Sequence, residues 1–280
     1  MTPLFFNSIR LYTGFIFVLA MYILFSLYTK KKNAGKIPSE PAGNRKPLSY
    51  QLMGGVACGL VYALGSICQQ WGLYFTTAGK TGFITTMYTI LVPILSWILF
   101  KKKVKRQIWA GAVLAVMGLF FIAGGMGFHL SAGDIVVFIG AIFFAMQILL
   151  TGHFVQHTSV LLLNTVQLAT AGTVSLIAAL FFEDGNSLSA VIDAAGIILY
   201  AGVVCIGAAY LLQGVGLKKA SPSVAAIILS FESVFGAIFG AVILKESMNG
   251  GQLFGCALIF SAIIVSQFDR RSVTVKSEQQ

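Results

Sequence analysis

The chain has few charged residues for its length. Only 10% of its 280 residues are Asp, Glu, Lys or Arg, whereas 57% are hydrophobic, and the mean hydropathy is +0.87. Charged residues make up about a quarter of an ordinary soluble domain. This balance excludes a soluble globular protein. It predicts an all-α membrane protein, because apolar runs of about 20 residues cross a bilayer as helices.

Cysteine, histidine and long polar stretches are also scarce. The four cysteines lie inside apolar runs and form no C-x-x-C pair, and buried free cysteine behaves as a small hydrophobe. We therefore expect no disulfide framework, no metal site and no cofactor. The longest polar stretch, residues 29–49, is too short to fold alone, which excludes an attached ATPase or nucleic-acid-binding domain. No cluster of nucleophiles lies within the apolar runs, so we predict that the protein is not an enzyme.

Nine apolar runs are long enough to be read as membrane spans. They cover approximately residues 5–28, 50–75, 82–100, 107–125, 134–152, 160–182, 190–215, 223–244 and 251–267. Of the nineteen basic residues, sixteen follow the first, third, seventh and ninth spans. Basic loops face the cytoplasm in the positive-inside rule. The formal net charge of +10 is therefore a topology signal rather than a nucleic-acid signal, and it predicts a cytoplasmic C-terminus in a multi-pass protein of the plasma (inner) membrane.

The two halves of the sequence echo one another. Gly65 and Gly72 recur 142 residues later as Gly207 and Gly214, and after a shift of two residues Lys101 recurs as Lys245. Five spans separate the copies, and because five is odd the second copy enters the membrane from the opposite side. Inverted repeats of this kind are typical of secondary transporters.

The repeat predicts two five-helix halves, of which the first is incomplete. We expect a first repeat over residues 1–125 with four helices, a second repeat over 130–268 with five, and a cytoplasmic tail over 269–280. The present chain would then contain 4 + 5 spans and lack the first helix of the fold, through truncation or a mis-set start.

Glu232 is the only acidic residue near the middle of a span. An ionisable group at that depth costs about 2.5–3.5 kcal/mol and usually faces the bundle interior. It would either contact substrate and couple its movement to protons, or hydrogen-bond a neighbouring helix and stabilise the packing. The sequence leaves these two roles open.

Polar and aromatic residues inside the spans are candidates for a solute cavity, since binding pockets are mostly apolar with a few converging polar groups. Singly, each is better explained by hydrogen bonding between helices. Pro93 is the predicted helix break of the third span. The default expectation is a kink, and the alternative is a full interruption that exposes backbone carbonyl groups. The cavity candidates are Tyr62, Gln69, Gln70, Thr85, Tyr88, Gln147, Tyr210 and Gln213.

Several stretches resemble the EamA family of the drug/metabolite transporter superfamily. They are Gln70-Trp71-Gly72-Leu73-Tyr74 with the following Thr77 to Phe83, then Leu91-Val92-Pro93-Ile94, Leu229 to Phe235, Leu244-Lys245-Glu246, and Asp134 after Ser131-Ala132-Gly133. The resemblance implies ten helices in two inverted halves and movement of small metabolites, often outward. The chain departs from the family pattern at Ser233, where proline is usual.

We therefore predict a secondary transporter that exports small metabolites, amino-acid-like or drug-like solutes, by alternating access. Its partners would be a small-molecule solute, the lipid bilayer and, as a hypothesis, protons, with no nucleic acid. The sequence does not predict an oligomeric state. The alternatives are a passive facilitator, a membrane-embedded enzyme, which would need a nucleophile or metal cluster, and a truncated chain that does not transport.

Overall fold

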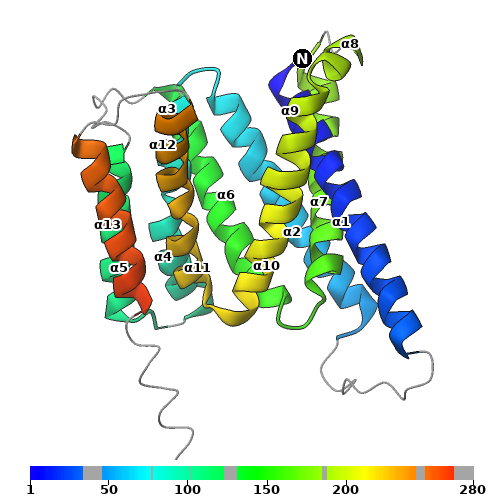
Figure 1. Cartoon of the computed structure of the whole chain (residues 1–280), viewed down its shortest axis with the longest axis horizontal. Coiled ribbons are helices and arrows are strands. Elements are labelled where there is room, and N and C mark those ends of the chain that lie inside the picture. The colour runs from blue at the N-terminus through cyan, green and yellow to red at the C-terminus, as the bar shows by residue number, and fades with distance from the viewer. Residues whose placement is uncertain are drawn as a thin grey trace, which may run out of the picture. The chain divides into compact units, whose positions relative to one another are not determined.

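The computed structural model describes residues 1–33, 46–76, 78–101, 103–122, 131–184, 188–243 and 250–267. The predicted cytoplasmic tail and most of the Lys-rich stretch after the first span lie outside these residues. Throughout the described part the regular structure is helical (Figure 1), which confirms the all-α class. The elements are α1 (Pro3–Asn33), α2 (Leu48–Gly72), α3 (Ala78–Thr85), α4 (Tyr88–Phe100), α5 (Arg106–Ile122), α6 (Ala132–Phe154), α7 (Val160–Phe182), α8 (Leu188–Asp193), α9 (Ala195–Leu199), η2 (Tyr200–Ala208), α10 (Ala209–Lys219), α11 (Pro222–Leu229), α12 (Phe231–Ile243) and α13 (Gly250–Gln267).

Each of the nine predicted spans coincides with one helix or with a run of consecutive helices. Among the residues that the structure describes, six segments are long and apolar enough to cross a membrane, and three shorter apolar helices cover residues 106–122, 222–235 and 250–266. Many large apolar side chains point outward, including Phe181 at 81% exposure and Leu212 at 72%. Such a surface is unfavourable in water and suits lipid. The protein is therefore a multi-pass membrane protein.

The chain forms two compact units, and each combines a segment from early in the sequence with one from later. The first unit contains residues 1–70 and 150–219, and the second contains 71–149 and 220–280. The units do not coincide with the two sequence repeats, because each unit takes helices from both halves. The repeat boundaries at 125 and 130 remain a prediction.

In the first unit, α1 packs along α7 and η2 (Figure 1). Close approach depends on small residues: a Cβ added at Gly202 would lie 2.5 Å from Thr13 Cβ, and one at Gly14 would lie 2.8 Å from Ile206 Cγ2. Helices in lipid gain most from such contact, because the lipid tails are as apolar as the side chains. This packing holds α1 in place against two helices from the second half of the sequence.

In the second unit, α5 and α13 lie side by side (Figure 1). Gly118 and Gly255 face each other so closely that a Cβ at Gly118 would meet Gly255 O at 2.7 Å, and one at Gly255 would meet Gly118 O at 2.5 Å. Leu119 and Ile259 are buried next to them. The two backbones are therefore in direct contact, which only glycine at both positions allows.

Two spans are interrupted in their first half by a short turn. The third predicted span divides into α3 and α4 at Thr86 and Met87, and the eighth divides into α11 and α12 at Ser230. Thr86 Oγ1 donates to Gly82 O at 2.7 Å, and Ser230 Oγ donates to Ile227 O at 2.6 Å. Hydroxyl groups that bond back to the preceding turn compete with the helical ladder and bend it.

The full interruption at Pro93, the alternative to the predicted kink, is not found, and the kink itself stays a prediction. Helix α4 continues through Pro93, which is its sixth residue and is buried. Proline removes the one bond that its own N–H would make to the carbonyl four residues earlier, and the helix tolerates that loss here. The interruption lies instead at Thr86–Met87, where Met87 N bonds Ile84 O and Ile90 N bonds Met87 O in the tighter three-residue pattern.

The seventh span changes its helical pitch. It begins as the short helices α8 and α9, continues for nine residues as the π-helix η2, and ends as α10. π-Helical turns are rare and are found mostly at functional positions. Gly202 and Gly207 of η2 face Thr13 and Phe17 of α1.

Candidate functional site

The turn at Ser230 places Glu232 near the start of a helix. Because α12 begins at Phe231, Glu232 lies in the first turn of a helix that starts within the membrane span. The first N–H groups of a helix lack intrahelical partners and carry partial positive charge. Glu232 therefore lies at the end of α12 whose dipole favours a negative charge. The residue is exposed by surface area.

Tyr88 of the second unit lies at the matching place in the other interrupted span. It is the first residue of α4 and is 8% exposed. Its hydroxyl lies within electrostatic range of the Glu232 carboxylate. The offset of 144 residues that relates Lys101 to Lys245 also relates Thr86 to Ser230 and Tyr88 to Glu232. If this offset of the predicted repeat already applies at Thr86, the two turns and the two polar side chains that follow them are equivalent positions in it.

Helices α4 and α11 of this unit pack together beside that pair. Thr89 Oγ1 donates to Ala226 O across the contact at 3.4 Å. Two other predicted cavity residues lie in the same unit: Thr85 is half-buried at the end of α3, and Gln147 is 1% exposed in α6. Both have polar partners, so hydrogen bonding within the protein accounts for at least part of their role.

The remaining cavity candidates lie in the first unit. Tyr62 of α2 is 4% exposed, and its ring meets the ring of Tyr210 of α10 with centroids 4.8 Å apart. Gln69 and Gln70 at the end of α2 and Gln213 in α10 are half-buried. The eight candidates are therefore divided between the two units, and their convergence on one cavity remains a prediction.

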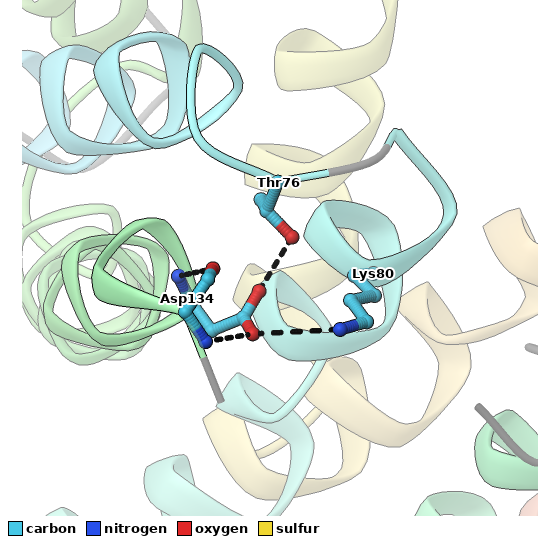
Figure 2. Close-up of polar contacts among 4 residues, drawn as sticks. Thr76, Lys80 and Asp134 are labelled. Atoms are coloured by element: carbon cyan, nitrogen blue, oxygen red, sulfur yellow. Dashed lines mark hydrogen bonds and ion pairs between the residues drawn. The ribbon is translucent and has the colours of Figure 1, made fainter. Parts of the chain in front are cut away.

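Asp134 anchors the start of α6, a role that sequence reasoning missed. Ser131 and Asp134 form a reciprocal capping box, in which Ser131 N donates to Asp134 Oδ2 at 2.9 Å and Asp134 N donates to Ser131 Oγ at 3.2 Å. Figure 2 shows that the same carboxylate accepts a bond from Thr76 Oγ1 at 2.5 Å and pairs with Lys80 Nζ at 3.7 Å. Asp134 therefore ties α6 to the segment that joins α2 and α3.

A second polar cluster in the first unit was also missed. Asn7 of α1 is fully buried and donates through Nδ2 to Ser66 Oγ of α2 at 3.0 Å and to Ser175 Oγ of α7 at 3.1 Å. Its Oδ1 accepts from Arg10 Nε at 3.0 Å and from Nη2 at 2.8 Å. Buried Asn and Ser inside an apolar run are the signal that could have revealed it.

The model of the EamA-like transporter family matches residues 1–124 and again 131–268. The chain belongs to the EamA-like transporter family. An uncharacterized transporter of Archaeoglobus fulgidus is 31% identical over 75% of this chain and 67% of its own length. The uncharacterized transporter YetK of Bacillus subtilis is 28% identical over 74% of this chain and 65% of its own length.

One crystal structure of another protein shares the fold, with a TM-score of 0.75 at 14% identity over 96% of this chain and 87% of that chain. The chain spans about two thirds of the length of the two curated relatives above. This family membership places the protein among membrane transporters that act on small molecules. Within the described residues, no three His, Cys, Asp or Glu side chains are grouped as a metal site.

Proposed function

We propose that this protein is a secondary transporter of the plasma membrane that exports small amino-acid-like or drug-like metabolites by alternating access. The observation that carries the proposal is the placement of Glu232 in the first turn of α12, directly after the turn at Ser230. Interrupted helices whose ends face the solute are a recurrent device of secondary transporters. Family membership supports the transport class.

In this proposal Glu232 couples solute movement to protons. The helix N-terminus stabilises the charged carboxylate, and the low polarity of the span favours the neutral form. Opposing influences of this kind allow the group to change its charge during a transport cycle. Tyr88, at the equivalent repeat position and within range of the same carboxylate, would donate a hydrogen bond to its charged form. Tyr62 and Tyr210 of the first unit would supply apolar ring surface to the solute.

The test uses the purified full chain in liposomes with a panel of radiolabelled amino acids and an imposed pH gradient. For one proton per solute, a gradient of about one pH unit supports at most roughly tenfold accumulation. We expect the wild type to accumulate a solute from the panel and Glu232→Gln only to equilibrate it. Asp184→Asn, a matched change at an exposed acid, should accumulate as the wild type does. Gradient-driven accumulation by Glu232→Gln would refute the coupling role.

A passive facilitator is the second candidate function. The half-buried Gln69, Gln70 and Gln213 of the first unit are uncharged and need no titration to bind a polar solute. Equilibration by the wild type, without accumulation under any gradient, would favour the facilitator and reject coupled export.

A further inference from the structure

Arg10 is a charged side chain within the first candidate span, Pro3–Thr29. It lies seven residues after the start of α1, which corresponds to about 10 Å along the helix axis. Ionisable residues inside spans usually pair with an opposite charge or belong to a solute path. Within the described part of the chain, Arg10 pairs with no carboxylate; its contacts are the Asn7 oxygen and the ring of Phe6, whose centroid lies 5.7 Å from Cζ.

Glu183, one of the acidic residues of the same unit, bonds to the backbone of α1. Glu183, directly after α7, accepts from Leu4 N through Oε1 and from Phe5 N through Oε2, both at 3.0 Å. Its negative charge therefore stabilises the N-terminus of α1. It does not neutralise the guanidinium, and the positive charge of Arg10 remains for another anion.

The guanidinium is held in one orientation by a chain of buried hydrogen bonds. Ser66 Oγ donates to Ala63 O at 3.0 Å, and so it accepts from Asn7 Nδ2. Because Asn7 uses its nitrogen for Ser66 and Ser175, its oxygen must face Arg10 and takes two bonds from it. A snorkelling arginine has a free tip, whereas this one is anchored to an amide with no exposed surface. Such connected networks fix side-chain position.

One edge of the guanidinium is left for a ligand. Nε and one N–H of Nη2 are used, and the other groups, including both N–H of Nη1, donate to nothing among the described residues. The residue as a whole is half-buried, so part of its surface is exposed. A planar pair of N–H donors matches a carboxylate in a bidentate geometry. Asn7 adds no charge that would cancel the attraction.

We propose that Arg10 binds the carboxylate of the transported solute, and that Asn7, Ser66 and Ser175 are its positioning residues. This inference rests on the proposed transport function and assigns its substrate class: small molecules that carry a carboxylate. The shared chemistry is an oxyanion, which a lipid phosphate could also supply, so the test separates the two sources.

The test measures thermal stabilisation of the purified full chain in dodecyl maltoside micelles, which contain no phosphate. The probes are the twenty common L-amino acids and benzoate, each beside its carboxamide. We expect at least one acid to stabilise the wild type where its amide does not. Hydrogen bonds to charged groups correspond to about ten- to a hundredfold in affinity, so Arg10→Gln should weaken binding of that acid by this factor, and Arg10→Lys, which lacks the planar fork, by part of it. Arg106→Gln, an exposed arginine at the start of α5, is the matched control and should bind as the wild type does.

Three outcomes would overturn the inference. They are stabilisation by no acid over its amide, retention of the acid preference in Arg10→Gln, and Arg10-dependent stabilisation by short-chain phosphatidylglycerol alone. The last result would assign Arg10 to lipid. Unliganded Tm values of the variants show whether each is folded, and Arg10→Lys covers the case in which Arg10→Gln is not. Binding without any transport in liposomes would reject the proposed function and leave the carboxylate site intact, so the two failures are distinguishable.

Discussion

Replacing Asp134 by alanine removes three interactions at once. The carboxylate is 3% exposed, accepts from Thr76 Oγ1 at 2.5 Å and from Ser131 N at 2.9 Å, and pairs with Lys80 Nζ at 3.7 Å (Figure 2). A hydrogen bond to a charged group contributes about 1.5–3 kcal/mol. Lys80 is 24% exposed, so its pair with Asp134 adds about 0–1 kcal/mol.

These contributions are not additive, because all of them end on one carboxylate. We therefore expect Asp134→Ala to lower the free energy of unfolding by about 3–4 kcal/mol. Asp134→Asn keeps the side-chain shape and one carbonyl acceptor, so we expect a loss of about 1–2 kcal/mol. Thr76→Val removes only one of the bonds and leaves the capping box intact, with an expected loss of about 1 kcal/mol.

The assay is thermal unfolding of the purified protein in detergent, followed by tryptophan fluorescence. At about 2–4 °C per kcal/mol for a chain of this size, Asp134→Ala should lower the apparent Tm by roughly 10 °C. Asp193→Ala is the matched control: this side chain is exposed at the end of α8, and surface changes stay within about 0.5 kcal/mol. Equal Tm values for the two alanine variants would refute the anchoring role of Asp134.

Two further predictions concern packing and helix ends. Gly118→Ala and Gly255→Ala should each lower the free energy of unfolding by about 1–3 kcal/mol or more, because each new Cβ would press on the facing carbonyl. Gly216→Ala is the control, since its Cβ would meet nothing within 4 Å. Equal stability of all three variants to urea or heat would contradict the close contact. Glu183→Gln should lower the free energy of unfolding by about 1 kcal/mol, because it removes the negative charge at the N-terminus of α1. Asp184→Asn is the control and should unfold as the wild type does in the same assay. A Glu183→Gln protein as stable as the wild type would show that the bonds to Leu4 and Phe5 need no charge.

Hydropathy predicted the spans well because it responds to composition over about 20 residues, and burial in lipid depends on composition. It could not locate the turns within spans. Thr86 and Ser230 are ordinary residues in an apolar run, and their effect depends on whether the hydroxyl bonds back to the helix. Pro93 was the obvious local signal, yet the helix continues through it.

The polar sites were predictable only in part. Glu232 stood out because a carboxylate at mid-span is costly wherever it lies. The role of Asp134 depends on Thr76, which is 58 residues away, and that of Asn7 depends on Ser175, which is 168 residues away. No periodicity within a single span encodes such pairings, since they arise only when helices distant in sequence pack together.

The π-helix η2 has a consequence for insertions and deletions. Gly202 and Gly207 are five residues apart and face Thr13 and Phe17, which are four apart on α1. One wide turn of η2 thus matches one ordinary turn of α1, and the segment holds one residue more than an α-helix would need there. Removal of a single residue between Gly202 and Gly207 would restore the common pitch and keep both contacts. The same deletion within α10 would rotate every later side chain of that helix by about 100°.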